Sequence, residues 1–450
     1  MEGVHSLVLD WCSLCIEQPQ PKLNILKVVC LCLRLQHQIL WSVQPYGLPL
    51  NVELLPEKLR KLGYRTHLVG KWHLGMCKWE YTPTYRGFDS FYGYYSLLLT
   101  HFTKQHTAIQ DRSITGYDFR DNTGVVPKTD EFISEMFLKR AEKLIDEHYG
   151  DQPMFLYFSL DLPKWPSEAP QKYLDMYAHI ENPDRRGLSA MVSAMDDIVG
   201  NLTRKLKEKE MWEDTLFVFF SDNGGFPYLA ASNWPFRGGG GTLFEGGTRV
   251  PGFVSGSSSL LKNIGTVSNE LIHITDFHTT FLKLAGGTPE DDLDGLDVWD
   301  TLSKGKSSPR KEMVYNIDDV MPGPGAAIRI GDYKLIVGNP EIFYPRRSLE
   351  YTDGWHPPAK TNATKFTRTP VHFGELGDVP PPANVTMLFN LKDDPEERNN
   401  LAKDYPMKVE ELRLRLKEYE KGLMPSINPP PDLKRSNPAN FGGVWSPGWC

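Results

Sequence analysis

The stretch that decides the fold of this chain is Phe217–Gly225, which reads FVFFSDNGG. Its first four residues are aromatic or β-branched, and such a short apolar run predicts a buried strand. An aspartate, an asparagine and two glycines follow after one serine. A carboxylate and an amide oxygen at the carboxyl end of a strand supply half of a site for a hard cation. The same residues are common in ordinary turns, so the neighbouring patterns must decide between the two interpretations.

Helical and strand-like patterns alternate around this stretch, which favours an α/β fold with a mainly parallel sheet between layers of helices. Apolar residues at helical spacing predict helices at Leu54–Leu62, after Thr129, and along Met191–Leu206. Short apolar runs predict strands at Thr66–Val69 and Met154–Phe158.

Polar residues follow the predicted strands at the point where each strand ends. Lys71 and His73 follow the first of them, a further polar loop follows Phe158, and Asp222 and Asn223 follow the third. Ligands bind at the carboxyl ends of the strands in open parallel sheets. We therefore expect these loops to form one site.

The composition changes after Trp299, where residues 302–309 are rich in Ser, Lys, Gly and Pro. This change predicts a domain boundary. We expect residues 35–305 to form the larger domain and residues 306–450 to form a smaller α+β domain, with strands at Ala327–Val337 and a charged helix near Pro406–Gly422. Residues 1–34 show no clear period, and we assign them no fold.

The overall charge argues against nucleic acid as a partner, and the apolar content argues against a transmembrane segment. The chain has 450 residues and a net charge of −7 without a basic block, so nucleic acid is not an expected partner. The apolar run Leu23–Leu35 is interrupted by Lys27 and Arg34 and is too short to span a bilayer. We expect no transmembrane segment, and the N-terminus does not resemble a signal peptide.

Six motifs appear in a fixed order along the chain. They are GKWHLG at Gly70–Gly75, SDNGG at Ser221–Gly225, NWPFRG at Asn233–Gly238, LFEGGTRVP at Leu243–Pro251, LDGLDVW at Leu293–Trp299 and LFNLKDDPEER at Leu388–Arg398. In this order they resemble the sulfatase family, in particular the branch of arylsulfatases B, I and J. The resemblance begins near Leu35 and continues to Trp445.

The resemblance implies an alkaline-phosphatase-like α/β fold and the hydrolysis of a sulfated glycan or an aryl sulfate ester. It also implies a bound Ca²⁺ and a formylglycine made from the cysteine of a Cys-x-Pro-x-Arg motif. Similarity to arylsulfatase B favours N-acetylgalactosamine 4-sulfate as substrate and a lysosomal or secreted protein. The sequons at Asn201, Asn362 and Asn384 are candidate glycosylation sites and agree with that location.

Carried over by position, the resemblance makes Asp222 and Asn223 the second pair of metal ligands. It makes Lys71 and His73 the residues that assist the nucleophile and the sulfate. Lys164 stands where the family has a histidine, and Gly240 stands where the family has a second sulfate-binding lysine. Lys164 and Arg237 remain candidates for weaker contacts with the substrate.

The first pair of metal-binding aspartates and the nucleophile have no counterpart in this sequence. Asp10 follows the strand-like run Ser6–Leu9, but it is a single aspartate. Cys30 and Arg34 have the spacing of the formylglycine motif without its central proline or alanine, so no formylglycine is encoded. Without its first strand, the sheet is expected to expose strand edges and to fold poorly.

Three hypotheses follow. The chain is an arylsulfatase-B-like protein with impaired or absent catalysis, because a site without its nucleophile and half of its metal ligands loses most of its rate enhancement. Alternatively, it is an active N-acetylgalactosamine-4-sulfatase-like enzyme whose true N-terminus is absent from this sequence. The third hypothesis is a non-catalytic protein that binds sulfated glycans.

Overall fold

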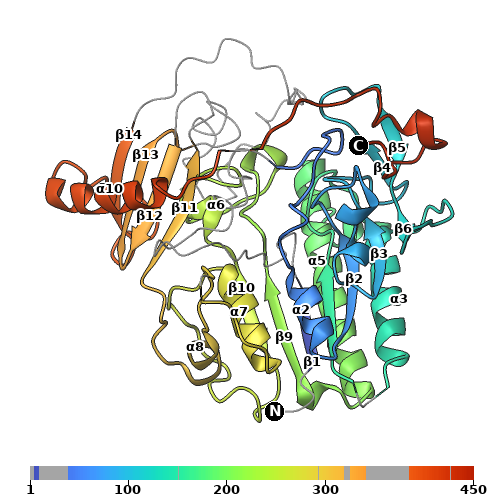
Figure 1. Cartoon of the computed structure of the whole chain (residues 1–450), viewed down its shortest axis with the longest axis horizontal. Coiled ribbons are helices and arrows are strands. Elements are labelled where there is room, and N and C mark those ends of the chain that lie inside the picture. The colour runs from blue at the N-terminus through green and yellow to red at the C-terminus, as the bar shows by residue number, and fades with distance from the viewer. Residues whose placement is uncertain are drawn as a thin grey trace.

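The computed structural model describes residues 5–9, 39–149, 152–291, 293–318, 325–340, 385–425 and 427–450, and for residues 5–9 it describes the backbone alone. These residues form a large sheet flanked by helices and a smaller antiparallel sheet towards the C-terminus (Figure 1). The predicted fold class, α/β with a smaller C-terminal α+β part, is confirmed. A division at residue 305 stays a prediction.

The large sheet has the strand order β10-β9-β1-β8-β2-β3-β6-β7 in the described part of the chain. Its central strands are parallel, and the pairs at both edges are antiparallel. The strands are β1 (His5–Leu9), β2 (Arg65–Lys71), β3 (Ser90–Tyr94), β6 (Arg120–Asp121), β7 (Gly124–Val125), β8 (Met154–Ser159), β9 (Thr215–Phe220) and β10 (Gly252–Ser255).

Strand β1 corrects the expectation that the sheet lacks a central strand. His5–Leu9 lies between β8 and β9 and pairs in parallel with both. The physical reason is that a five-residue strand with a partner on each side satisfies its backbone polar groups without any helical or alternating pattern in its sequence. The assignment of no fold to residues 1–34 was therefore wrong for this stretch. Asp10 and Cys30 lie outside the described residues.

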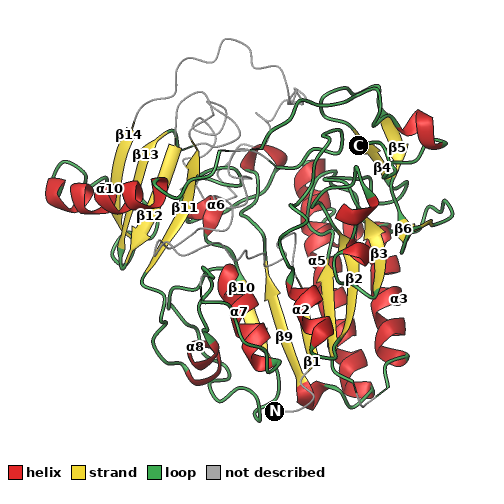
Figure 2. Cartoon of the chain, viewed as in Figure 1, coloured by secondary structure: helices red, strands yellow, loops and turns green. Residues whose placement is uncertain are grey.

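Helices cover both faces of the sheet, as Figure 2 shows. Strand β8 divides its side chains between these faces, because Phe155 and Tyr157 belong to one apolar cluster while Leu156 and Phe158 belong to the other. This alternation is the period of two that a strand imposes. The covering helices are α2 (Leu55–Lys61) and α7 (Thr275–Leu284) on the first face, and α3 (Ile133–Asp146) and α5 (Pro183–Glu208) on the second.

The remaining elements of the larger part are short. They are α4 (Gln171–Met176), α6 (Glu245–Thr248), α8 (Trp299–Lys304) and the hairpin of β4 (Gln105–Thr107) and β5 (Thr115–Tyr117). Among the described residues, no helix combines the length and the hydrophobicity that crossing a membrane requires.

The smaller sheet is antiparallel, in the order β11-β12-β13-β14 within the described residues. Helix α10 (Pro406–Glu420) packs Val409, Leu412 and Leu416 against the apolar face of this sheet. The predicted charged helix and the predicted strands at Ala327–Val337 are therefore confirmed. The strands are β11 (Glu312–Asp318), β12 (Gly325–Ile330), β13 (Tyr333–Gly338) and β14 (Val385–Asn390).

A buried ion network joins the two parts. Lys334 of β13 lies 2.9 Å from a carboxylate oxygen of Glu245 and 2.9 Å from one of Glu397, and all three side chains are almost fully buried. Burial opposes the charge of Lys334, but the two carboxylates outweigh it and raise the pKa of this lysine. Burial also opposes the charge of Glu245, yet Lys334 holds the pKa of Glu245 below its ordinary value.

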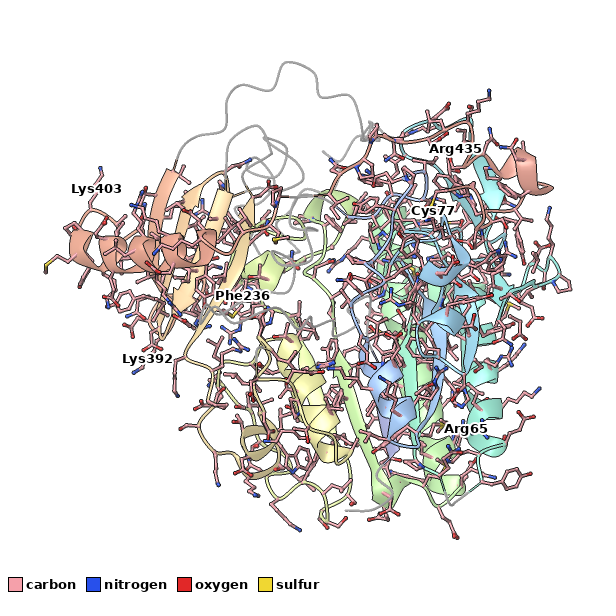
Figure 3. The ribbon with its side chains drawn as sticks, in the orientation of Figure 1. Arg65, Cys77, Phe236, Lys392, Lys403 and Arg435 are labelled. Carbon is pink, nitrogen blue, oxygen red and sulfur yellow. A yellow bond between two sulfur atoms is a disulfide. The ribbon has the colours of Figure 1, made fainter. Side chains whose placement is uncertain are left out.

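A disulfide between Cys77 and Cys450 ties the C-terminal segment to the loop that follows β2. The backbone N–H groups of Gly448 and Trp449 donate to the carbonyl oxygen of Cys77 at 2.8 and 3.1 Å. Figure 3 shows Cys77 at the upper end of the large sheet and Arg65, the first residue of β2, at the opposite end. The C-terminus is thus fixed on the side where the carboxyl end of β2 lies.

Candidate functional site

Lys71 is the last residue of β2, and its side chain is only 9% exposed. The preceding Gly70 has a φ of +121°, and a Cβ atom there would lie 1.8 Å from the carbonyl oxygen of Ser159 in β8. Only glycine fits this approach between neighbouring strands. Gly70 thereby brings the loop after β2 close to the loop after β8.

His73 lies two residues further on in the left-handed region, with a φ of +59°. Its Nε2 is 3.0 Å from the carbonyl oxygen of Leu40, which can only accept a hydrogen bond, so Nε2 carries the proton. Burial and then the neighbouring Lys71 lower the pKa of His73 well below its ordinary value. His73 is therefore a neutral imidazole, with Nδ1 as its basic nitrogen.

Asp222 and Asn223 lie directly beyond β9, as predicted. Asp222 Oδ1 is enclosed and has no hydrogen-bond partner among the described residues. Burial raises the pKa of Asp222 to about 6, against the opposing effects of Lys71 and Lys164. Asn223 donates from Nδ2 to the carbonyl oxygen of Gly224 at 2.8 Å.

Lys164 is the second ammonium group at this edge of the sheet. It forms an ion pair with Asp161 and donates to the hydroxyl oxygen of Tyr94. The Tyr94 hydroxyl in turn donates to Asp161 Oδ1 at 2.6 Å. Asp161 Oδ2 also lies 3.9 Å from Nδ1 of His101, whose pKa burial lowers to about 4. Lys164 is thus held in place by partners that the sequence did not single out.

The structure brings Lys71, His73, Lys164 and Asp222 into one electrostatic group. Lys71 and Lys164 both act on the pKa of Asp222, and the same two lysines act on the pKa of His73. These side chains come from the loops after β2, β8 and β9, as expected for the carboxyl ends of parallel strands. Two ammonium groups face the carboxylates of Asp161 and Asp222.

Arg237 contacts Phe244 and the loop that carries Glu397. Its guanidinium stacks on the ring of Phe244, 4.2 Å from the ring centre, and Nη1 donates to the carbonyl oxygen of Glu397 at 3.4 Å. Arg237 therefore joins its loop to the smaller sheet, and its role towards a substrate stays a prediction.

Among the predicted glycosylation sites, Asn201 alone falls within the described residues. It lies inside α5, where its Oδ1 accepts a hydrogen bond from Arg204 and the Thr203 hydroxyl donates to the carbonyl oxygen of Val199 at 2.9 Å. Asn362 and Asn384 lie outside the described residues. Glycosylation stays a prediction at all of these sequons.

Phe226 fills the space beside Gly240, where the resemblance places a second lysine. A Cβ atom on Gly240 would lie 2.7 Å from the carbonyl oxygen of Gly224 and 2.8 Å from two ring carbons of Phe226. The backbone N–H of Gly240 donates to the carbonyl oxygen of Gly225 at 3.0 Å. The loop at Gly240 is therefore packed against the Asp222 loop without room for a side chain.

Replacing Gly240 with lysine is expected to lower the free energy of unfolding by about 1–3 kcal/mol, because the new side chain overpacks the contact with Phe226. Urea denaturation measures this change. The double variant Gly240→Lys with Phe226→Ala should recover part of the loss. Gly200→Ala is the matched control, since nothing lies within 4 Å of a Cβ atom there. Full stability of the single variant would contradict this account of the loop.

The metal site that the resemblance implies is incomplete in the described part of the chain. The orphaned Oδ1 of Asp222 is suited to a cation, but Ca²⁺ takes about six to eight oxygen ligands. No cluster of at least three His, Cys, Asp or Glu side chains in the described ranges could hold a metal ion. Asp222 and Asn223 alone therefore do not fit a calcium ion.

The arrangement of strands and strand-end loops defines a member of the alkaline-phosphatase-like α/β class. A model of the sulfatase family matches residues 31–287. The chain belongs to the sulfatase family.

Named relatives agree with this assignment. The chain is 38% identical to mouse arylsulfatase J over 438 residues, which cover 92% of this chain and 69% of that protein. It is 29% identical to mouse N-acetylgalactosamine-6-sulfatase over 423 residues, covering 90% and 74% of the two chains.

Solved structures share the fold at low sequence identity. Ps i-CgsB in complex with k-i-k-neocarrahexaose superposes with a TM-score of 0.72 at 20% identity and covers 95% of this chain and 94% of that chain. The PsFucS1 sulfatase from Pseudoalteromonas sp. gives a TM-score of 0.66 at 21% identity, covering 95% and 92%.

Proposed function

We propose that this chain binds the sulfate ester of a glycan at the carboxyl edge of its large sheet, and that its hydrolysis of that ester is weak. The observation that carries the proposal is the group formed by Lys71 and Lys164 with Asp222 and Asp161. Two ammonium groups balance two carboxylates, so a bound sulfate does not meet an excess of negative charge. In the sulfatase family a divalent ion supplies much of that positive charge.

Weak hydrolysis is inferred from positions inside the body of the chain. Lys164 stands in place of a histidine, and an ammonium group paired with Asp161 is a poorer proton carrier near neutral pH than an imidazole. Glycine stands at position 240, where a lysine is expected, and the ring of Phe226 occupies the space beside it. Each lost electrostatic donor in such a site costs about 10²–10³ in rate.

The proposed ligand is a sulfated galactosamine unit, because relatives of this chain include an N-acetylgalactosamine-6-sulfatase. We also propose that the protein is lysosomal or secreted and passes through the oxidising lumen of the endoplasmic reticulum, for which the Cys77–Cys450 disulfide is the supporting observation.

Calorimetric titrations of the purified chain with N-acetylgalactosamine 4-sulfate and with N-acetylgalactosamine 6-sulfate test the binding. We expect the heat of binding to persist after a chelator is added, since Lys71 and Lys164 supply the positive charge. Unsulfated N-acetylgalactosamine is the control and should bind far more weakly. The absence of binding to either sulfated sugar, with or without added Ca²⁺, would remove the proposal.

An active N-acetylgalactosamine sulfatase is the second candidate. The observation that favours it is β1. This central strand pairs in parallel with β8 and β9, so its carboxyl end lies beside theirs. Release of inorganic sulfate by the purified chain separates this candidate from the first.

A further inference from the structure

Two half-exposed tryptophans adjoin the candidate site. Trp165 is 50% exposed and follows Lys164 directly in the chain. Trp234 is 49% exposed and follows Asn233. The side chain of Asn233 accepts a hydrogen bond from the N–H of Gly225 at 2.8 Å and donates to the carbonyl oxygen of the same residue at 2.9 Å. Each tryptophan is therefore anchored next to one of the loops that carry the site.

The loops that bear these tryptophans pack on the same turn of α5. A Cβ atom on Gly187 of α5 would lie 2.2 Å from the carbonyl oxygen of Ser167, two residues beyond Trp165. Arg185 of the same helix donates from Nη1 to the carbonyl oxygen of Ala230 at 2.8 Å, four residues before Trp234. The two tryptophans thus stand on loops beyond β8 and β9 that both contact the first turns of α5.

A half-exposed indole ring beside polar side chains is suited to one kind of ligand surface. The face of a pyranose ring carries C–H groups that pack on an aromatic ring, while its hydroxyl groups stay in water. Indole combines a large apolar face with a polar N–H, so it can make this contact at a wet surface. In a longer ligand, the sugar units next to the sulfated one contact residues around the sulfate site, and Trp165 directly follows Lys164.

We propose that Trp165 and Trp234 stack on sugar rings that flank the sulfated unit, so that the ligand is a sulfated oligosaccharide or polysaccharide and not a small aryl sulfate. This inference rests on the proposed function and adds the length of the ligand to it. The two tryptophans contribute affinity for flanking units, and Lys71 contributes affinity for the sulfate.

Titrations with N-acetylgalactosamine 4-sulfate and with a chondroitin 4-sulfate hexasaccharide test the proposal in three variants. Trp165→Ala and Trp234→Ala are each expected to weaken hexasaccharide binding roughly threefold to tenfold, the range of an aromatic stacking contact. Binding of the monosaccharide should stay unchanged. The matched control is Tyr149→Ala, an 85% exposed aromatic residue before β8, at the opposite edge of the sheet.

The outcomes separate the two proposals. If the unaltered protein binds neither ligand, the proposed function fails. If it binds both ligands equally and the tryptophan variants match Tyr149→Ala, the stacking inference alone is overturned. Because both indoles are half-exposed, the variants should keep the melting temperature of the unaltered protein. Quenching of tryptophan fluorescence by the hexasaccharide, reduced in each tryptophan variant, would support the contact directly.

Discussion

Replacing Lys71 with alanine is expected to weaken binding of a sulfated sugar about 10- to 100-fold. A hydrogen bond between an ammonium group and an anion contributes about 1.5–3 kcal/mol, and Lys71 is enclosed, so water screens its charge little. Calorimetric titration with N-acetylgalactosamine 4-sulfate measures the change. The loss should appear with and without a chelator, because the charge belongs to the protein.

Lys139→Ala is the control for this variant. Lys139 lies on α3 with 67% of its side chain exposed and pairs with Glu131, so its removal takes away the same charge far from the site. We expect no change in affinity. Equal affinities for Lys71→Ala, Lys139→Ala and the unaltered protein would show that the sulfate does not bind at the end of β2.

Replacing Lys334 with methionine is expected to lower the free energy of unfolding by about 3–5 kcal/mol at neutral pH. The change preserves the volume of the side chain but leaves the buried carboxylates of Glu245 and Glu397 without their cation. An uncompensated buried charge is among the costliest single changes in a protein. Urea denaturation measures the loss.

The loss of stability in Lys334→Met is expected to depend on pH. Without Lys334, burial is the largest influence on the two carboxyl groups and raises their folded-state pKa values, against smaller opposing effects from Arg329 and Arg249 at Glu245 and from the backbone N–H of Glu245 at Glu397. The loss of stability should therefore be larger at pH 8 than at pH 5, where the carboxyl groups take up protons. Adding Glu245→Gln and Glu397→Gln should recover part of the stability. Lys304→Met, which removes an exposed pair with Asp300, is the control and should cost below about 1 kcal/mol.

Much of the fold could be predicted because its elements are strongly periodic. Met154–Phe158 and Phe217–Phe220 are apolar runs that became the central strands β8 and β9, and Met191–Leu206 became part of α5. The neighbourhood of Lys71, His73 and Asp222 followed from the rule that the carboxyl ends of parallel strands meet at one edge. Local pattern and topology were sufficient for these features.

Long-range partners could not be predicted in the same way. The Cys77–Cys450 disulfide spans 373 positions in sequence, and Lys334 meets Glu245 across 89 positions. Neither pairing produces a periodic pattern in the amino-acid sequence. Tyr94 likewise lies 67 residues from Asp161, although it helps to hold Lys164. Strand β1 was not placed in the sheet, although Ser6–Leu9 is strand-like, because its partners β8 and β9 lie far along the chain and the run itself does not identify them.

The close packing around Gly240 shows a further limit of sequence comparison. The sequence shows only that a lysine is missing there. The structure adds that Phe226 and the carbonyl oxygen of Gly224 occupy the space a side chain would need. A lysine at position 240, which the resemblance implies, would therefore disturb the packing of the Asp222 loop, and we expect that Gly240→Lys alone does not restore the site.

Release of inorganic sulfate from N-acetylgalactosamine 4-sulfate by this purified chain, with Ca²⁺ and with a chelator, is the most direct test of the account. We predict that release is slow and that the chelator does not change it, while the unaltered protein still binds the sulfated sugar. Metal-dependent release of sulfate that disappears in Lys71→Ala would contradict the account and establish the second candidate, an active sulfatase.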